Sequence, residues 1–280
     1  MWRSLLFVPI LNERLVAGAA RRGADALVLD LETGVTPNRK EEARATLIGI
    51  VASLTAARVD IAVRVNPLHL GGVDDIAVAR DAGADLIVLP QATPAATRDA
   101  AILAGATPLI PLVESPRGVI EALAIAEASS TVVGLGLGVE DYATAMNATP
   151  APDLLIPAAF QVIQAARATG CEPLVIPDTI ADYGNLPRFE AAALQAKALG
   201  SSGSFAIHPG QVEILNHVFL PSDEAIREAQ EIIAVAEKAG EMGDAIATQG
   251  GKMIDAPIIA RARALLALHQ DHLDRAKLSP

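Results

Sequence analysis

The stretch Leu109-Ile110-Pro111-Leu112-Val113-Glu114-Ser115-Pro116-Arg117 contains one junction between a strand and a helix. Its first five residues are an apolar run of strand length, which is typical of a strand buried on both faces of a parallel sheet. Pro116 follows at the start of a helical stretch, a position that proline favours. The junction predicts a β-then-α unit that carries an acid, Glu114, at the carboxyl end of its strand.

The same unit recurs along the chain. Eight apolar runs are expected to be strands: Ser4–Pro9, Ala26–Leu31, Ile61–Asn66, Leu86–Pro90, Leu109–Glu114, Val132–Gly136, Pro173–Ile176 and Ser204–Ile207. The clearest helices between them are Arg39–Leu54, Pro116–Ala128 and Ala151–Ala168. Eight such units in 280 residues predict an α/β fold, a (β/α)8 TIM barrel. An open, doubly wound sheet is the alternative that the pattern leaves open.

The chain changes character after His208-Pro209. Ser222–Gly240 and Asp255–His272 are predicted helices, separated by the glycine-rich stretch Gly240–Lys252. These residues exceed what eight units need. We therefore expect a catalytic barrel over residues 1–220 and a C-terminal helical extension over residues 221–280, which packs on its own barrel or on a neighbouring subunit.

Composition narrows the classes of function. A net charge of −11 disfavours nucleic-acid binding, which depends on an excess of Lys and Arg. The apolar run at the N-terminus ends at Pro9, too early for a membrane span, and it lacks a signal-peptide cleavage pattern. The single cysteine, Cys171, excludes an internal disulfide. The glycine-rich stretch Gly134–Gly138 lacks the spacing of a dinucleotide-binding loop. We expect a cytoplasmic protein that acts on a small molecule, with no nucleic acid and no membrane as partner.

Polar residues end most of the predicted strands, where the catalytic groups of a barrel lie. Glu114 and Asp141 follow neighbouring strands, and two carboxylates with water and substrate suffice to hold Mg²⁺. The alternative for each is an acid that caps a helix. His208, before Pro209, is expected to form hydrogen bonds at the barrel rim without a catalytic part.

Arg64 interrupts the apolar run Ile61–Asn66. A lone charge there is costly to bury, so it needs an anionic partner. Its guanidinium suits a bidentate carboxylate or a thioester oxygen of a substrate. A structural ion pair with Glu32 or Asp30 is the alternative.

These residues belong to a pattern that covers nearly the whole chain, and the chain resembles the citrate lyase β-subunit-like (CitE-like) branch of the HpcH/HpaI aldolase family. The matching segments are Arg3–Pro9, Gly23–Ala26, Asp30–Glu32, Lys40–Arg44, Val63–Asn66, Gly83–Asp85, Leu89-Pro90, Leu112–Ser115, Arg117-Gly118, Glu140-Asp141, Ala206–Val212 and Gly251–Pro257. Their order and spacing make the resemblance specific.

The resemblance implies a lyase that breaks or forms a carbon–carbon bond in a 3-hydroxyacyl thioester through an enolate, with malyl-CoA, citramalyl-CoA or citryl-CoA as typical substrates. It implies Mg²⁺, with Mn²⁺ as an alternative, and a homo-oligomer, a trimer or hexamer, whose C-terminal segment covers a neighbour's active site. By the same resemblance the metal ligands are Glu114 and Asp141, the substrate-binding residues are Arg64, Arg3 and Glu114, and the catalytic residues are Asp255, Arg64 and Glu32.

The sequence departs from the family pattern at Thr33, Gln91, Ser204, Pro177 and Ile10. Two of these positions usually carry a lysine, so the departures question a CoA site while leaving the metal acids intact. Two alternative functions follow. One is a class II pyruvate aldolase that acts on a 2-oxo acid without CoA, and the other is a non-catalytic subunit.

Overall fold

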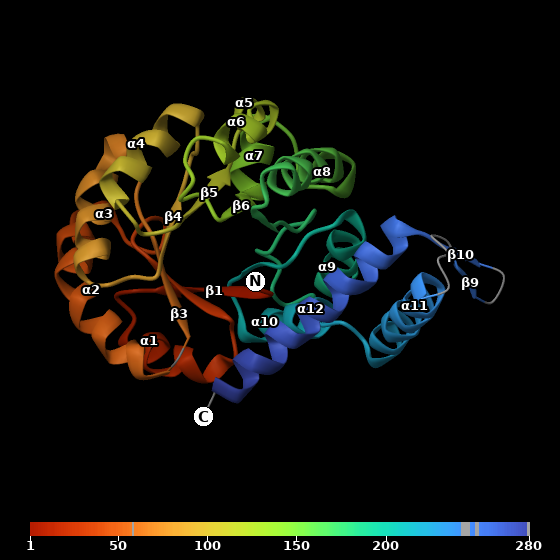
Figure 1. Ribbon diagram of the computed structural model, residues 1–280. Helices are drawn as coiled ribbons and strands as arrows, with labels where there is room; N and C mark the ends of the chain where they lie inside the picture. Colours follow the sequence, from red (N-terminus) through yellow and green to blue (C-terminus); the bar gives the residue numbers. More distant parts are fainter. Residues whose placement is uncertain (58, 242–246, 250–251, 279–280) are drawn as a thin grey trace. The chain divides into compact units, whose positions relative to one another are not determined.

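The computed structural model describes residues 1–57, 59–241, 247–249 and 252–278 (Figure 1). The chain forms two compact units, one over Trp2–Phe219 and the other over Leu220–Pro280 together with Met1. Each unit is described by itself below.

The larger unit is built on one parallel sheet of eight strands. In chain order the strands are β1 (Ser4–Pro9), β2 (Ala26–Asp30), β3 (Asp60–Arg64), β4 (Leu86–Leu89), β5 (Leu109–Val113), β6 (Gly134–Leu137), β7 (Glu172–Leu174) and β8 (Ser204–Ala206). Every predicted strand is present, with bounds that shift by no more than two or three residues. The apolar runs located the strands well because polar residues or prolines end nearly every one of them.

The order of the strands distinguishes a barrel from an open sheet. The sheet runs β7-β6-β5-β4-β3-β2-β1-β8, and β1 pairs with β8 through Ser4 and Ser204. A parallel bridge between Leu174 and Gly203 joins the two remaining edges. The (β/α)8 TIM-barrel prediction is therefore confirmed, and the open doubly wound sheet is excluded.

The pleat of the strands directs the polar residues into the barrel. Side chains alternate between the two faces of a strand. Val28 of β2 and Ile110 of β5 belong to the apolar cluster inside the barrel, and their neighbours along the chain pack outward against the helices. Asp30 and Glu114 lie an even number of residues further along these strands. Their side chains therefore continue the inward-facing rows at the carboxyl end of the barrel.

Helices cover the outside of the sheet (Figure 1). They are α1 (Glu13–Ala19), α2 (Lys40–Leu54), α3 (Gly72–Asp81), α4 (Pro94–Ala104), α5 (Pro116–Ile120), α6 (Ala122–Ala126), α7 (Val139–Ala145), α8 (Pro152–Thr169), α9 (Leu186–Leu199) and α10 (Pro209–Val218). The prediction of a single helix over Pro116–Ala128 is wrong, because two short helices occupy this stretch. They are separated by Glu121, whose backbone lies outside the helical region at φ −95° and ψ 11°. Gly118 lowers the helical propensity of the first segment.

The C-terminal unit contains α11 (Asp223–Glu241), β9 (Ala247–Gln249), β10 (Lys252–Ile254) and α12 (Ala256–Leu278). Its two helices were expected. The antiparallel pairing of β9 with β10 was not, since strands of three residues are too short to show an alternating pattern. Residues 242–246 and 250–251 of the glycine-rich stretch lie outside the described residues. Within the described residues, each helix is too short or too polar to cross a bilayer.

Candidate active site

Arg64 ends β3 and is held by a set of groups from β2 and β1. Its Nε and Nη2 atoms each donate to Asp30 at 2.8 Å, and its Nη1 lies 3.0 Å from Glu32. Nη2 also donates to the Thr33 hydroxyl, and the guanidinium lies 4.5 Å from the centre of the Phe7 ring. Burial lowers the pKa of Arg64, but hydrogen bonds and charge from Asp30 outweigh it, so the net shift is upward. The Arg64 side chain is thus a fixed, permanently charged group.

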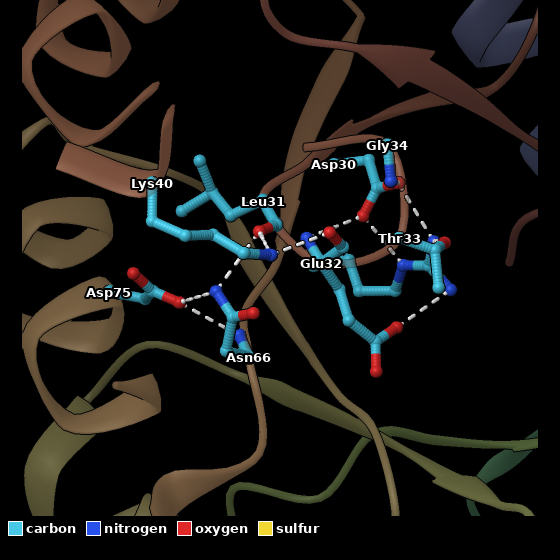
Figure 2. Close-up of polar contacts among 9 residues, drawn as sticks. Asp30, Leu31, Glu32, Thr33, Gly34, Lys40, Asn66 and Asp75 are labelled. Atoms are coloured by element: carbon cyan, nitrogen blue, oxygen red, sulfur yellow. Dashed lines mark hydrogen bonds and ion pairs between the residues drawn. The ribbon is translucent and has the colours of Figure 1, made fainter. Parts of the chain in front are cut away.

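Asp30 is buried yet fully satisfied. Besides both contacts with Arg64, it accepts hydrogen bonds from the backbone N–H groups of Glu32 at 2.9 Å and Gly34 at 2.6 Å (Figure 2). A carboxylate with four hydrogen bonds, two of them from a cationic side chain, is well compensated for its loss of water. The structural ion pair that the sequence offered as an alternative for Arg64 is therefore present with both Asp30 and Glu32.

A second network of hydrogen bonds holds the loop that follows β2 (Figure 2). Lys40 at the start of α2 donates to the carbonyl oxygens of Leu31 and Glu32, both at 2.6 Å. Asn66 donates to the Leu31 carbonyl at 3.0 Å and to the buried Asp75 at 2.6 Å. The loop that presents Glu32 and the partner of Arg64 is consequently fixed by side chains from α2 and from the segment after β3.

Glu114 has a different environment, although it lies at the same end of the barrel. It is 7% exposed, and its Oε2 accepts a hydrogen bond from the backbone N–H of Gln91 at 2.6 Å. Within the described part of the chain, no cationic side chain forms a salt bridge with it, since Arg64 is paired with Asp30 and Glu32. Burial, opposed by the Gln91 hydrogen bond and reinforced by the charges of Glu32 and Asp141, raises the pKa of Glu114 to about 8.

Asp141 lies in the first turn of α7 and is exposed to solvent. Its charge contributes to the raised pKa of both Glu114 and Glu32, although burial is the largest cause for each. The preceding residue, Glu140, accepts a hydrogen bond from the Thr179 hydroxyl. The structure therefore brings Asp141, Glu114, Glu32 and Arg64 to one mouth of the barrel.

Arg64, Glu114 and Asp141 line a cavity of about 120 Å³. Three acids and one cation line it, and the rest of the lining is almost entirely apolar. The lining residues are Phe7, Arg64, Leu112, Glu114, Leu137, Gly138, Val139, Glu140, Asp141, Ile176, Ile180, Ser204 and Phe205. Phe7 and Phe205 stack with ring centres 5.3 Å apart, and they form an aromatic floor beside Arg64. The space suits a small molecule with one anionic end and one short apolar part.

The acids of the mouth fit a hard divalent cation. Among the described residues, no group of three or more His, Cys, Asp or Glu side chains is arranged to hold a metal. Mg²⁺ does not need such a group, because it keeps several waters and binds through one or two carboxylates. The buried and unpaired Glu114, with Asp141 on the same cavity, provides that smaller set. The residues present therefore fit Mg²⁺, and they contain no His or Cys cluster of the kind that Zn²⁺ prefers.

Three other residues that the sequence singles out form contacts of their own. Arg3 precedes β1, at the opposite end of the barrel, where its guanidinium pairs with Asp25 at 2.6 Å. Asp255 belongs to the C-terminal unit and caps α12, accepting from the N–H of Ile258 at 3.3 Å. His208 caps α10 by accepting from Gly210, as its expected structural role requires. The structure does not bring Arg3 to the mouth of the barrel.

Several residues at the site were not predicted from the sequence. Gln91 holds Glu114 through its backbone, at a positive φ of 48°, and Gly138 provides the space that the Glu114 side chain fills. Phe7 and Phe205 form the floor of the cavity. Gly138 carried a usable signal, since it is a glycine directly after a barrel strand that faces the strand bearing Glu114. The contribution of Gln91 is a backbone effect and left no such signal.

Comparison with known proteins gives a consistent result. Residues 3–209 match the family model described as HpcH/HpaI aldolase/citrate lyase. The chain is 32% identical over 281 residues to the citrate lyase subunit beta of Escherichia coli (strain K12), covering 95% of this chain and 92% of that protein. It is 33% identical over 279 residues to a (3S)-malyl-CoA thioesterase of Cereibacter sphaeroides (strain ATCC 17029 / ATH 2.4.9), covering 95% and 94%. Protein CitE of Mycobacterium tuberculosis, solved in complex with magnesium, acetoacetate and coenzyme A, has a TM-score of 0.79 at 25% identity, covering 95% and 97%.

Proposed function

Because the chain belongs to the HpcH/HpaI aldolase/citrate lyase family and is a lyase of that class, we propose that it is a Mg²⁺-dependent carbon–carbon lyase acting on a 3-hydroxyacyl-CoA thioester. The substrate would resemble malyl-CoA, citramalyl-CoA or citryl-CoA, and the reaction would run through the enolate of an acyl thioester. The observation that carries the metal part of this proposal is the buried Glu114, which forms no salt bridge among the described residues and shares its cavity with Asp141.

In this proposal Glu114 and Asp141 hold Mg²⁺. When bound, the ion would supply Lewis-acid stabilisation of the oxyanions that develop on the substrate. Arg64 would bind the substrate carboxylate or the enolate oxygen, and its fixed geometry suits either task because no reorganisation is needed during the reaction. Its alignment is set by Asp30 and by the Phe7 ring.

Cleavage requires that the substrate hydroxyl loses its proton while the carbon–carbon bond breaks and its electron pair moves into the enolate. Glu32 is the group of the mouth suited to accept that proton or to orient Arg64. Burial, partly offset by Arg64, raises its pKa above the usual value for Glu. A raised pKa makes the Glu32 carboxylate a stronger base toward the substrate hydroxyl.

Asp255 is proposed to protonate the enolate carbon. The family resemblance suggests that this acid comes from the C-terminal segment of a neighbouring subunit in a homo-oligomer, a trimer or hexamer. Asp255→Asn offers a clean test, because Asn caps a helix as well as Asp and the α12 cap should survive. Turnover should collapse while Mg²⁺ affinity and thermal stability stay unchanged.

The names of the relatives favour a CoA thioester, since one is a (3S)-malyl-CoA thioesterase and another was solved with coenzyme A. A second candidate is a class II pyruvate aldolase without a CoA requirement. It is favoured by the small cavity of about 120 Å³ and by Ser204 in its wall, where the family usually carries a lysine. Both candidates share the metal and Arg64, and they differ in the compound that is enolised.

Deuterium exchange distinguishes the thioester lyase from the pyruvate aldolase, and it also tests whether the reaction depends on Mg²⁺. With Mg²⁺ in D₂O, the methyl group of acetyl-CoA should exchange if the chain is a thioester lyase, and the methyl group of pyruvate if it is the aldolase. Glu114→Gln should abolish exchange and weaken Mg²⁺ binding by more than about 100-fold, beyond the loss expected for a group that only orients a ligand. Wild-type Mg²⁺ affinity in Glu114→Gln, measured by calorimetry, would disprove the proposed metal site.

A further inference from the structure

We infer that Gly138 is a positioning residue for Glu114, and that Mg²⁺ affinity at the mouth depends on the absence of a side chain at position 138. The inference rests on the proposed role of Glu114 as a metal ligand. It adds a residue at the junction between β6 and α7, which acts on the metal site through Glu114.

The Glu114 carboxylate occupies the space that a side chain at position 138 would need. A Cβ atom added to Gly138 would lie 2.5 Å from Cγ and 2.8 Å from Oε1 of Glu114. The other oxygen, Oε2, accepts the hydrogen bond from the Gln91 N–H at 2.6 Å. The carboxylate is therefore confined between the end of β4 on one side and the bare Cα of Gly138 on the other.

Glycine is not required at this position for backbone reasons. Gly138 has φ −86° and ψ 91°, values that any L-residue adopts without strain. Its place is also fixed, because its N–H donates to the Val113 carbonyl at 2.9 Å and its carbonyl accepts from Tyr142 at 3.0 Å. An added methyl group could not move away with the backbone, so the Glu114 side chain would have to move instead.

A displaced Glu114 would lose its alignment toward the cavity. The side chain is 7% exposed and packs at the barrel mouth, so a new rotamer would break the Gln91 hydrogen bond or turn the carboxylate away from Asp141. Outer-shell groups that orient a ligand typically contribute 10- to 100-fold to metal affinity. We therefore expect Gly138→Ala to weaken Mg²⁺ binding by at least about tenfold while the barrel remains folded.

Gly49→Ala is the matched control. Gly49 is exposed on α2, and a Cβ added to it meets nothing within 4 Å. The substitution is chemically identical, and it should leave Mg²⁺ affinity within about twofold of the wild type by calorimetry on the metal-free full chain. Unchanged affinity in Gly138→Ala, together with lost affinity in Glu114→Gln, would overturn the inference while leaving the proposed metal site intact.

A double-mutant cycle on thermal stability tests the contact without any metal. Gly138→Ala should lower the melting temperature of the wild-type chain but have little effect in a Glu114→Ala background, where the colliding atoms are gone. An equal loss in both backgrounds would show that Gly138 acts through something other than Glu114, and would overturn the inference. If Glu114→Gln retains Mg²⁺ affinity, the proposed function fails, and the cycle still decides the contact separately.

Discussion

The two sides of the barrel mouth handle their acids in opposite ways. On the β2–β3 side, the Asp30 carboxylate lies against Arg64 with contacts at 2.8 Å, and the buried Asp75 lies against Arg44 at 2.7 Å. On the β5–β6 side, Glu114 is also buried but accepts a hydrogen bond only from a backbone N–H. It forms no salt bridge among the described residues, and the charges of Glu32 and Asp141 outweigh the attraction of Arg64. One side is electrostatically complete within this chain, and the other has an excess of negative charge.

This difference supports the place proposed for the metal, on the β5–β6 side. An unpaired carboxylate in a buried site raises its pKa or finds a positive charge. In the metal-free chain, burial raises the pKa of Glu114 to about 8, so that the carboxyl group stays protonated more readily. A bound divalent ion would neutralise the ionised Glu114 instead. On the β2–β3 side no such ion is needed, because Arg64 already supplies the positive charge.

The largest effect is expected from removing the cation of the complete side. Arg64→Leu leaves the buried Asp30 without its partner, and breaking a buried pair in this way costs about 3–5 kcal/mol of stability. Urea denaturation of the metal-free chain measures the loss. Arg117→Leu is the control, since the Arg117 side chain is 81% exposed and its pair with Glu121 should contribute no more than about 1 kcal/mol. Equal losses in the two variants would refute the view that the β2–β3 side depends on internal charge pairing.

Lys40 is expected to have the next largest effect. Lys40→Met removes two hydrogen bonds to the carbonyl oxygens of Leu31 and Glu32, which should cost about 1–3 kcal/mol and loosen the loop that carries Glu32. Lys197→Met is a matched control, because Lys197 also donates to a carbonyl, that of Val218, at 2.6 Å.

Both lysine variants should lose stability, but only Lys40→Met should lower the rate of deuterium exchange at saturating substrate. A comparable fall in Lys197→Met would mean that general destabilisation, and not loop positioning, explains the effect.

The incomplete side should respond in the opposite direction. The pKa of Glu114 is raised above its unfolded value, so the folded state holds the proton more tightly than the unfolded state does. The contribution of Glu114 to the free energy of unfolding is therefore fully present below about pH 4.5, and it is lost as the pH rises toward about 8. Glu114→Gln removes the charge, and in EDTA it should raise stability at pH 9 while leaving it almost unchanged at pH 4.

Thermal melts at the two pH values test this sign. Glu213→Gln, at an exposed acid on α10, should shift the melting temperature by less than one degree or so at either pH. A Glu114→Gln variant that is less stable than the wild type at pH 9 would show that the carboxylate is already compensated.

Only part of this difference between the two sides of the barrel mouth can be predicted from the sequence. The apolar runs set the strands, and strand alternation then places Glu114 and Asp30 on the inward face without further information. Arg64 was recognised because a charge in an apolar strand needs a partner, and Asp30 and Glu32 were among the candidates. The compensation itself depends on which side chains meet across neighbouring strands. The backbone bond from Gln91 depends on a left-handed residue and is not encoded in a local pattern. The glycine at position 138 is visible in the sequence, but its contact with Glu114 follows only from the register of the barrel.

Gln91→Gly should have the smallest effect. It tests whether residue 91 positions Glu114 through its backbone N–H alone. Gln91 has φ 48°, a conformation that glycine adopts more readily than glutamine, so the folded state gains from the substitution. The unfolded chain gains freedom as well, so the net change in stability should be within about 1 kcal/mol of zero. The N–H that donates to Glu114 at 2.6 Å is retained, and Mg²⁺ affinity should therefore stay within about twofold of the wild type. If calorimetry finds a tenfold loss of affinity, the Gln91 side chain itself contributes to the incomplete side, and the charge deficit there is smaller than the contacts of Glu114 indicate.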